Sequence, residues 1–336
     1  MIVLKTGALF VTAIGLSLVL GEMGLRMVFD DVTTTYDNRS YFALKWKKLN
    51  VRLNSMGYRE KEFDRAKQPG VYRIAFIGDS FAFGQGIAEN ERMSNILEAE
   101  LRQHRSGVEV LNFGRPGHNT ADEVRVLQTE VLPTADPDFV LLQWYVNDVE
   151  FERPQIDTSV GNTFEVERDR VNEFKQMMLN KSVIYFLLAD LSHRVRAKVG
   201  MSHIEEMVTR TTDSGNQEIL EAKMAMVKFL RSCKEKNVPV AVFLVPDLAP
   251  LGERPYPLSH LHSKVLEWCR QEGVTCVDIF PVFEPYLRDV AKYETLWVNR
   301  FDIHMGALAN RLAATRLLEV FGPVWKAGQS MSPSGS

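Results

Sequence analysis

Residues 72–86, YRIAFIGDSFAFGQG, decide the fold of this chain. Their first part, Arg73–Ile77, is a short run of β-branched, aromatic and other apolar residues, which predicts a buried strand. The run ends at Gly78-Asp79-Ser80, residue types that are common in sharp turns. A helical pattern follows at Glu91–His104. The segment therefore predicts a strand, a tight turn and a helix in succession.

The same alternation continues along the chain. Four more strands are expected, at Val108–Asn112, Phe139–Gln143, Val238–Val245 and Thr275–Asp278. Helical patterns lie between or after them, at Ala121–Leu132, Gln217–Lys236, His260–Gln271 and Gly306–Phe321. Apolar strands that alternate with helices indicate a parallel sheet covered on both faces. The expected fold class is thus α/β, a three-layer α/β/α sandwich with about five parallel strands.

The N-terminus carries an apolar segment. Thr6–Leu20 contains no charged residue, and the pattern continues past Glu22 and Arg26, giving roughly 20 residues of helix, enough to span a bilayer. A cleaved signal peptide is the alternative, but no small-x-small cleavage site follows. We expect an uncleaved transmembrane helix, with Lys5 on the cytoplasmic side and the rest exported.

The domain organisation follows from these patterns. Residues 30–71 are polar and irregular, and residues 150–214 interrupt the alternation with a long, charged and partly helical insertion, either a lid or a solvated decoration. The predicted segments are a signal anchor at 1–29, a lead-in at 30–71, the α/β domain at 72–322 and a flexible tail at 323–336.

Composition excludes several classes of function. The chain has 336 residues, 45% apolar, and a formal charge of −3, which offers no basis for binding nucleic acid. The three cysteines are too scattered for a disulfide scaffold or a zinc site, although Cys269 and Cys276 are candidates for pairing. The seven histidines are dispersed, and the glycine-rich turn lacks the Gly-Lys-Ser/Thr of a phosphate-binding loop. No metal or cofactor is expected.

Four short motifs carry candidate chemistry, each after a predicted strand or before the last helix. They contain Ser80, then Gly117 in a Gly/Pro loop, then Asn147, and finally Asp302 with His304. Taken singly, each motif is equally consistent with a structural role, as a turn, a loop, an Asx-turn or a helix cap. Together they supply a nucleophile, hydrogen-bond donors for an oxyanion, a base and an acid to orient that base.

This order of Ser, Gly, Asn and His resembles the SGNH hydrolase (GDSL-like lipase and esterase) family over roughly residues 72–321. Three segments are similar in sequence to the membrane-anchored bacterial branch of that family: residues 54–59 (NSMGYR), 78–86 (GDSFAFGQG) and 110–120 (VLNFGRPGHNT). The resemblance implies a flavodoxin-like SGNH fold in which Ser80 is the nucleophile and His304 the base. It also implies an oxyanion hole formed by Ser80, Gly117 and Asn147.

Two positions depart from the family pattern. Tyr145 stands where a glycine usually precedes the asparagine, which would narrow or reshape the pocket. Phe301 stands where the aspartate usually lies, three residues before the histidine. Asp302 is therefore the first candidate for the acid, and Asp278, after the fifth strand, is the alternative. Asp79 is interpreted as a turn residue.

The expected function is an esterase that removes O-acyl or O-acetyl groups from a carbohydrate or lipid. One alternative is an O-acetyltransferase that modifies an exported polysaccharide with a membrane acyltransferase as partner. A non-catalytic binding or assembly protein is the alternative of another class. The expected location is the bacterial inner membrane, crossed once, with the catalytic domain periplasmic or extracellular.

Overall fold

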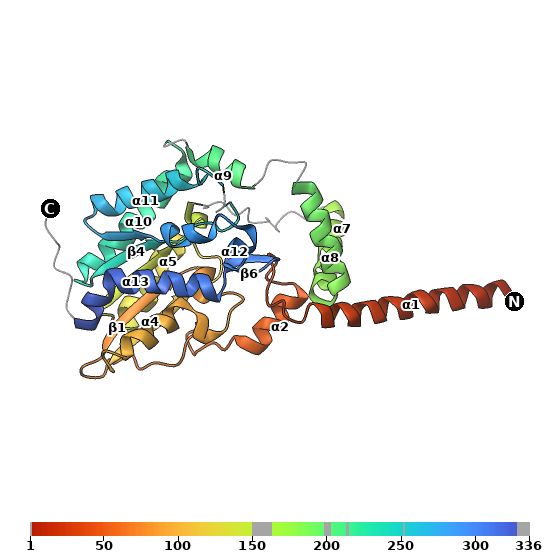
Figure 1. Ribbon diagram of the computed structural model, residues 1–336, viewed down its shortest axis with the longest axis horizontal. Helices are drawn as coiled ribbons and strands as arrows, with labels where there is room; N and C mark the ends of the chain where they lie inside the picture. The colour runs from red at the N-terminus through yellow and green to blue at the C-terminus, as the bar shows by residue number, and fades with distance from the viewer. Residues whose placement is uncertain (1, 150–162, 198–202, 213–214, 251–252, 328–336) are drawn as a thin grey trace. The chain divides into compact units, whose positions relative to one another are not determined.

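The computed structural model describes residues 2–149, 163–197, 203–212, 215–250 and 253–327 (Figure 1). The chain divides into two compact units. The first, called here the helical unit, comprises Met1–Leu49 and Ile156–Ser202. The second, called the sheet unit, comprises Asn50–Gln155 and His203–Ser336. The predicted lead-in at 30–71 is thus divided between the two units.

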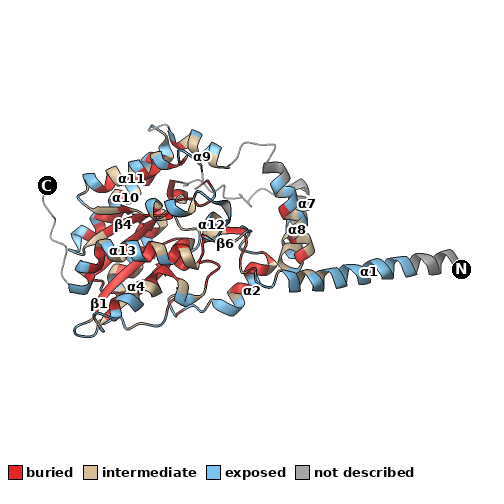
Figure 2. Ribbon diagram, viewed as in Figure 1, coloured by how far each residue is buried: buried red, intermediate tan, exposed pale blue. Residues whose placement is uncertain are grey.

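The sheet unit is built on five parallel strands in the order β2-β1-β3-β4-β5. Their bounds are β1 Tyr72–Gly78, β2 Val108–Gly114, β3 Phe139–Trp144, β4 Val240–Leu244 and β5 Thr275–Asp278. Every residue of β1 and β3 is buried, and β1 appears red in Figure 2. Strands buried on both faces need the continuous apolar runs from which the parallel sheet was predicted, and that prediction is confirmed.

Helices cover both faces of this sheet. α4 (Met93–Arg102) packs with α13 (Ala307–Ala327) on one face (Figure 1), while α10 (Gln217–Glu235) packs with α5 (Thr120–Val126) and α11 (Ser259–Gln271) on the other. The predicted three-layer sandwich is therefore confirmed. Shorter elements complete the unit: α3 Ser80–Phe83, η1 Glu89–Glu91, η2 Leu127–Val131, α6 Leu132–Thr134, η3 Val146–Val149, α9 His203–Thr212, η4 Phe280–Tyr286 and α12 Val290–Glu294.

Two features near the C-terminus differ from the sequence-based expectations. Asp302 and His304 were expected on a loop, but they lie on β7 (Asp302–Met305), which pairs antiparallel with β6 (Trp297–Asn299). The tail was expected from residue 323, but α13 continues to Ala327 and the side chain of Trp325 is fully buried. The apolar contacts of this tryptophan, including a ring contact with Phe139 at 5.6 Å, hold the last helical turn on the sheet unit.

The helical unit contains α1 (Ile2–Val28), α2 (Tyr41–Asn50), α7 (Thr163–Lys181) and α8 (Val183–Ala197). Its core includes Phe42 and Phe186, whose rings meet edge to face at 5.5 Å. The predicted insertion at 150–214 therefore belongs to this unit in part, as α7 and α8, while α9 belongs to the sheet unit. Residues 150–162, 198–202 and 213–214 of that prediction lie outside the described residues.

The helix α1 has the length and apolarity of a membrane span. Its segment Leu9–Val28 has a mean hydropathy of 1.5, and none of it is buried within the protein. Helices of this kind at an N-terminus serve either as membrane anchors or as signal sequences.

Candidate active site

Ser80 lies at the carboxyl end of β1, as the first residue of the short helix α3. The preceding residue, Asp79, caps this helix, because its Oδ1 accepts a hydrogen bond from the backbone N–H of Phe81 at 2.8 Å. From β3, the Oε1 of Gln143 accepts from the backbone N–H groups of Asp79 and Ala82, each at 3.2 Å. The turn around Ser80 is thus held by side chains on both sides, and Asp79 is the turn residue that was predicted.

The structure brings Ser80, His304 and Asp302 together, although 224 residues of sequence separate the serine from the histidine. The Oγ of Ser80 lies 2.8 Å from the Nε2 of His304. The other ring nitrogen, Nδ1, lies 2.5 Å from the Oδ1 of Asp302. Asp302 is buried, and the side chain of His304 is 22% exposed. Such a chain can move a proton from the hydroxyl to the ring while the carboxylate orients the ring.

The surroundings of His304 set its protonation. Burial lowers the pKa of this imidazole, but the charge of Asp302 and the hydrogen bond to it raise the pKa, and the net shift is upward from the ordinary value of 6.5. The ring of Phe81 packs against the imidazole, with ring centroids 4.9 Å apart. The neighbouring carboxylate therefore stabilises the imidazolium form, which is the form that appears after the ring has taken a proton.

The alternative acid, Asp278, has a different partner. Its Oδ2 lies 2.8 Å from the Nδ1 of the buried His262, and its Oδ1 accepts from the backbone N–H of Phe280 at 2.8 Å. Asp278 therefore pairs with His262, while Asp302 pairs with the histidine that contacts Ser80.

The two remaining predicted site residues, Gly117 and Asn147, follow β2 and β3 at the same edge of the sheet. Gly117 adopts a φ of 81°, a conformation that favours glycine because it has no Cβ. The Nδ2 of Asn147 donates to the backbone oxygen of His118 at 3.2 Å, which joins the two loops. Asn147 also lies close enough to Asp79 to lower the pKa of that carboxyl. The loop that carries Asn147 thus lies beside the Ser80 turn and is joined to the loop that carries Gly117.

Tyr145, which departs from the family pattern, packs within this cluster. Its ring contacts that of Phe81, with centroids 4.4 Å apart. Burial raises the pKa of its phenol, and a nearby buried carboxylate, Asp247, raises it further by its charge and by a hydrogen bond. The phenol therefore stays neutral and is held in place by that carboxylate. Tyr145 thus packs on the ring of Phe81, which in turn packs on the imidazole of His304.

Three buried carboxyl groups lie near one another at this site, and only Asp79 was considered from sequence. Asp79, Glu123 and Asp148 are each at most 1% exposed. Burial raises the pKa of Asp79 to about 6 and raises those of Glu123 and Asp148 well above their ordinary values, and the charge of Asp79 raises the pKa of Glu123 and of Asp148 further. The Oδ2 of Asp148 accepts from the backbone N–H of Tyr145 at 2.8 Å, which ties this carboxyl to the loop that carries Asn147.

Arg59 supports the segment after Ser80, and sequence reasoning assigned it no role. Its guanidinium is buried and donates to the backbone oxygens of Phe83 at 3.2 Å, Gly84 at 2.7 Å and Ile87 at 3.0 Å. These acceptors lie at or just beyond the end of α3, where helix carbonyl groups need partners. A signal was present in the sequence, since Arg59 ends the NSMGYR motif, but the motif alone did not indicate which backbone it would contact.

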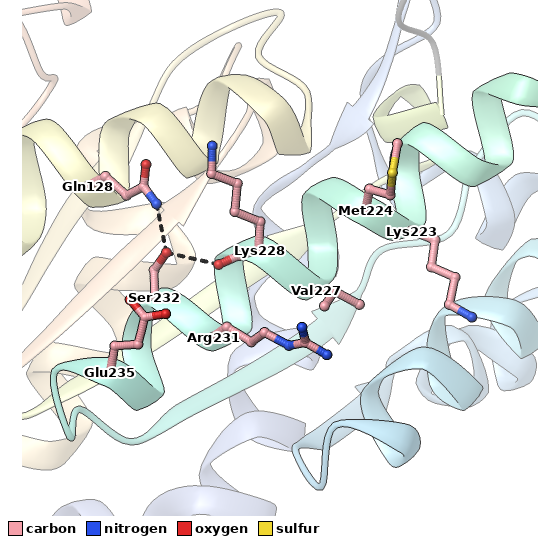
Figure 3. Close-up of a pocket in the computed structure, with 8 residues that line it drawn as sticks. All are labelled: Gln128, Lys223, Met224, Val227, Lys228, Arg231, Ser232 and Glu235. Atoms are coloured by element: carbon pink, nitrogen blue, oxygen red, sulfur yellow. Dashed lines mark hydrogen bonds between the residues drawn. The ribbon is translucent and has the colours of Figure 1, made fainter.

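A separate hollow of about 460 Å³ lies on the sheet unit away from these residues (Figure 3). Its lining comes from η2 and α10, and the Nε2 of Gln128 donates to the Oγ of Ser232 at 2.8 Å across it. Lys223 and Lys228 point in different directions in Figure 3 rather than toward a common centre. None of its lining residues is a predicted site residue.

Comparison with known proteins identifies the class that this fold and site define. The model of the GDSL-like lipase/acylhydrolase family matches residues 76–312, and the chain belongs to this family. The resemblance inferred from the four motifs is thereby confirmed. No curated protein matches the chain.

Several solved structures are similar to the chain at low sequence identity. A member of the lipolytic protein G-D-S-L family from Veillonella parvula has 13% identity and a TM-score of 0.45, over 75% of this chain and 99% of that chain. A catalytic mutant of Axe2, an acetylxylan esterase from Geobacillus stearothermophilus, has 14% identity and a TM-score of 0.46, over 80% and 100%. TesA has 10% identity and a TM-score of 0.46, over 75% and 99%.

Proposed function

We propose that this chain is a serine-dependent ester hydrolase in which Ser80 is the nucleophile, His304 the general base and Asp302 the acid that orients the base. The observation that carries the proposal is the continuous hydrogen-bonded chain from the Ser80 hydroxyl through the imidazole to the buried Asp302 carboxylate, at 2.8 and 2.5 Å. A serine hydroxyl is a weak nucleophile unless a base takes its proton, and this geometry provides that base.

The first step forms an acyl-enzyme. The Oγ of Ser80 attacks the ester carbonyl while the Nε2 of His304 takes the hydroxyl proton. The oxyanion that develops is met by the Ser80 and Gly117 backbone N–H groups and the Nδ2 of Asn147, each worth about 3 kcal/mol of barrier. As the tetrahedral intermediate collapses, the imidazolium returns its proton to the leaving alcohol and the Oγ–acyl bond remains.

The second step releases the acid. Water attacks the acyl carbonyl, and His304 again takes a proton, now from the water. The intermediate expels the Oγ of Ser80, which recovers its proton from the imidazolium, and the free carboxylic acid leaves. If a sugar hydroxyl replaces the water, the same residues transfer the acyl group instead, so the identity of the acceptor decides between esterase and acyltransferase.

The proposed substrate is an O-acyl or O-acetyl ester on a carbohydrate or lipid. The ring of Phe81, which packs on His304, and the ring of Tyr145, which packs on Phe81, support a short acyl group because bulky side chains near the base leave less room for a long chain. The proposed location is the bacterial inner membrane, with α1 as the anchor and the sheet unit outside the cytoplasm. The mean hydropathy of 1.5 over Leu9–Val28 supports the anchor, and Lys5 before it supports this orientation.

The test is hydrolysis of p-nitrophenyl acetate by the full-length protein in detergent, compared with Ser80→Ala and with Ser263→Ala as a matched control. Ser263 is exposed on α11, so its variant should keep the wild-type rate. Loss of turnover in Ser80→Ala alone supports the proposal. Equal rates in all three proteins would contradict it and favour a binding protein. Transfer of acetyl to an added oligosaccharide, dependent on Ser80, would establish the acyltransferase.

A further inference from the structure

The helix α8 begins directly against α1. Glu22 of α1 caps it, because its Oε1 accepts from the backbone N–H of Val183 at 2.9 Å and its Oε2 accepts from that of Ile184 at 3.1 Å. The same Oε2 accepts from the Oγ of Ser182 at 3.0 Å. A carboxylate at a helix N-terminus satisfies unpaired N–H groups and interacts favourably with the helix dipole. The junction of α7 and α8 is thereby fixed at the level of residue 22 on α1.

A second contact strengthens this junction. Arg26, one helical turn after Glu22, forms an ion pair with it at 2.8 Å and donates through Nη2 to the backbone oxygen of Lys181 at 2.7 Å. The two helices also approach closely at Gly21, where a Cβ would lie 3.8 Å from the Cδ1 of Ile184. From this point α7 and α8 extend to the side of α1 rather than along it (Figure 1).

Two faces of α8 are apolar, and among the described residues one face is buried while the other is largely exposed. Val183 and Phe186 are fully buried, and the ring of Phe186 packs on Phe42. On another face, Leu188 is 61% exposed and Leu191 is 59% exposed. The neighbouring helix α7 adds Phe174, which is 57% exposed, and Met177. Large apolar side chains gathered in this way on a protein surface usually mark an interaction site.

This exposed face continues into the apolar surface of α1. A groove of about 500 Å³ runs between the helices, lined by Leu18, Val19 and Met23 of α1 and by Ile184, Tyr185 and Leu188 of α8. Leu18 and Val19 belong to the segment that is long and apolar enough to span a membrane, and they are 55% and 57% exposed. Leu188 thus faces the membrane-spanning part of α1, so whatever covers that part of α1 also covers the groove.

We propose that the hairpin formed by α7 and α8 lies on the outer surface of the bilayer and buries the groove and the side chains of Leu188 and Leu191 among lipid acyl chains. The position along α1 agrees with this. The uncharged stretch Thr6–Leu20 ends two residues before Glu22, which places Glu22 and Arg26 near the headgroups and Leu18 just inside the hydrocarbon. Lys181, exposed at the border of the groove, carries a positive charge that suits anionic lipid phosphates.

The consequence is a second attachment to the membrane. A single helix allows a domain to rotate and tilt freely, whereas an interfacial hairpin fixed to it at Glu22 restrains the chain close to the lipid surface. The inference rests on the proposal that α1 spans the membrane, and is independent of the proposed ester chemistry.

The test places a fluorescent label on the hairpin of the full-length protein in vesicles of phosphatidylethanolamine and phosphatidylglycerol. Leu188→Cys and Leu191→Cys are labelled with bimane in a Cys276→Ser background, because Cys233 and Cys269 are buried. Leu16→Cys reports on α1, and Met224→Cys, at a position 64% exposed on α10, reports on water. Each label is exposed in turn to lipids with brominated acyl chains and to aqueous iodide.

Labels at residues 188 and 191 should be quenched by brominated lipid as the label at residue 16 is, and iodide should quench them about fivefold less than at residue 224. Quenching by iodide equal to that at residue 224 would overturn the inference. Protection from both quenchers would also overturn it, since a second copy of the protein would then cover the hairpin. Failure of brominated lipid to quench the label at residue 16 would overturn the spanning role of α1 and this inference with it.

Discussion

Asp302 holds His304 through one oxygen atom that accepts two hydrogen bonds. The Oδ1 of Asp302 accepts from the backbone N–H of His304 at 3.0 Å and lies 2.5 Å from the Nδ1 of its ring. Both residues belong to β7, and residues two apart on a strand project to the same face. The short Asp-x-His spacing is therefore sufficient, because the strand brings the two side chains together without an additional intervening residue.

This arrangement predicts the pH dependence of hydrolysis. Asp302 raises the pKa of His304 above its ordinary value of 6.5. Protonation of the imidazole should therefore reduce kcat/KM of the wild-type protein as the pH falls through that raised pKa. In Asp302→Asn the two raising contributions of Asp302 disappear while burial remains, so the acidic limb of kcat/KM should move to lower pH. The value of kcat/KM on the plateau above the acidic limb should fall by about 10³- to 10⁴-fold. A pH profile of p-nitrophenyl acetate hydrolysis measures both effects.

The matched control for this experiment is Asp278→Asn. Asp278 contacts His262 rather than His304, so this variant should keep the acidic limb of the wild-type profile. If instead Asp278→Asn moved the limb and Asp302→Asn left it in place, the assignment of the acid would be reversed.

A second prediction concerns the oxyanion donors. Asn147→Ala removes the side-chain N–H that lies beside the Ser80 turn, and we expect kcat for p-nitrophenyl acetate to fall by about 10²- to 10³-fold with a smaller change in KM. Asn216→Ala is the control, because Asn216 caps α10 by accepting from the backbone N–H of Glu218, and its loss should change stability but not kcat. A loss confined to KM in Asn147→Ala would show that the amide binds substrate only.

The parts of the fold that sequence predicts well are those whose burial is visible as an apolar pattern. β1 and β3 are buried on both faces, and their apolar runs were sufficient to place them and the turn at Ser80. The β6–β7 hairpin was missed because its strands are three and four residues long and only partly buried, so they leave no periodic signal. The end of α13 was missed because the helical pattern was taken to end at Phe321, while the burial of Trp325 holds a further turn of the helix on the sheet unit.

The candidate site divides in the same way. Ser80, His304 and Asp302 were predicted because the motifs that carry the nucleophile, the acid and the base follow one another in a recognisable order along the sequence. Arg59 and Glu123 were not predicted, because their roles depend on contacts across the fold that no local pattern encodes. The partner of Arg59 is backbone, which has no sequence signature, and a buried glutamate on a helix resembles any other glutamate in the sequence.

Arg59 supplies a third prediction. Arg59→Gln leaves buried carbonyl groups of Phe83, Gly84 and Ile87 without their donor, and we expect a loss of about 2–4 kcal/mol of unfolding free energy. The rate of hydrolysis should fall as well, since these carbonyls belong to the segment that follows Ser80. Arg231→Gln is the control, because Arg231 forms an exposed ion pair with Glu272 and should change stability by less than about 1 kcal/mol. Thermal melts and initial rates of both variants separate the two effects.

The buried Glu123 supplies a fourth prediction, about stability and pH. Burial and the charges of Asp148 and Asp79 raise its pKa above the ordinary value of 4.5, so the folded protein favours the protonated carboxyl. A group with a raised folded pKa gives its full contribution to stability below the unfolded pKa and loses that contribution as the pH rises toward the folded pKa.

Glu123→Gln keeps the shape of the side chain and cannot ionise. The melting temperature of Glu123→Gln minus that of the wild type should therefore be larger at pH 8 than at pH 5. Glu235→Gln, at an exposed position near the end of α10, is the control and should show no such trend. A Glu123→Gln difference that stayed constant between the two pH values would mean that Glu123 is ionised in the folded protein.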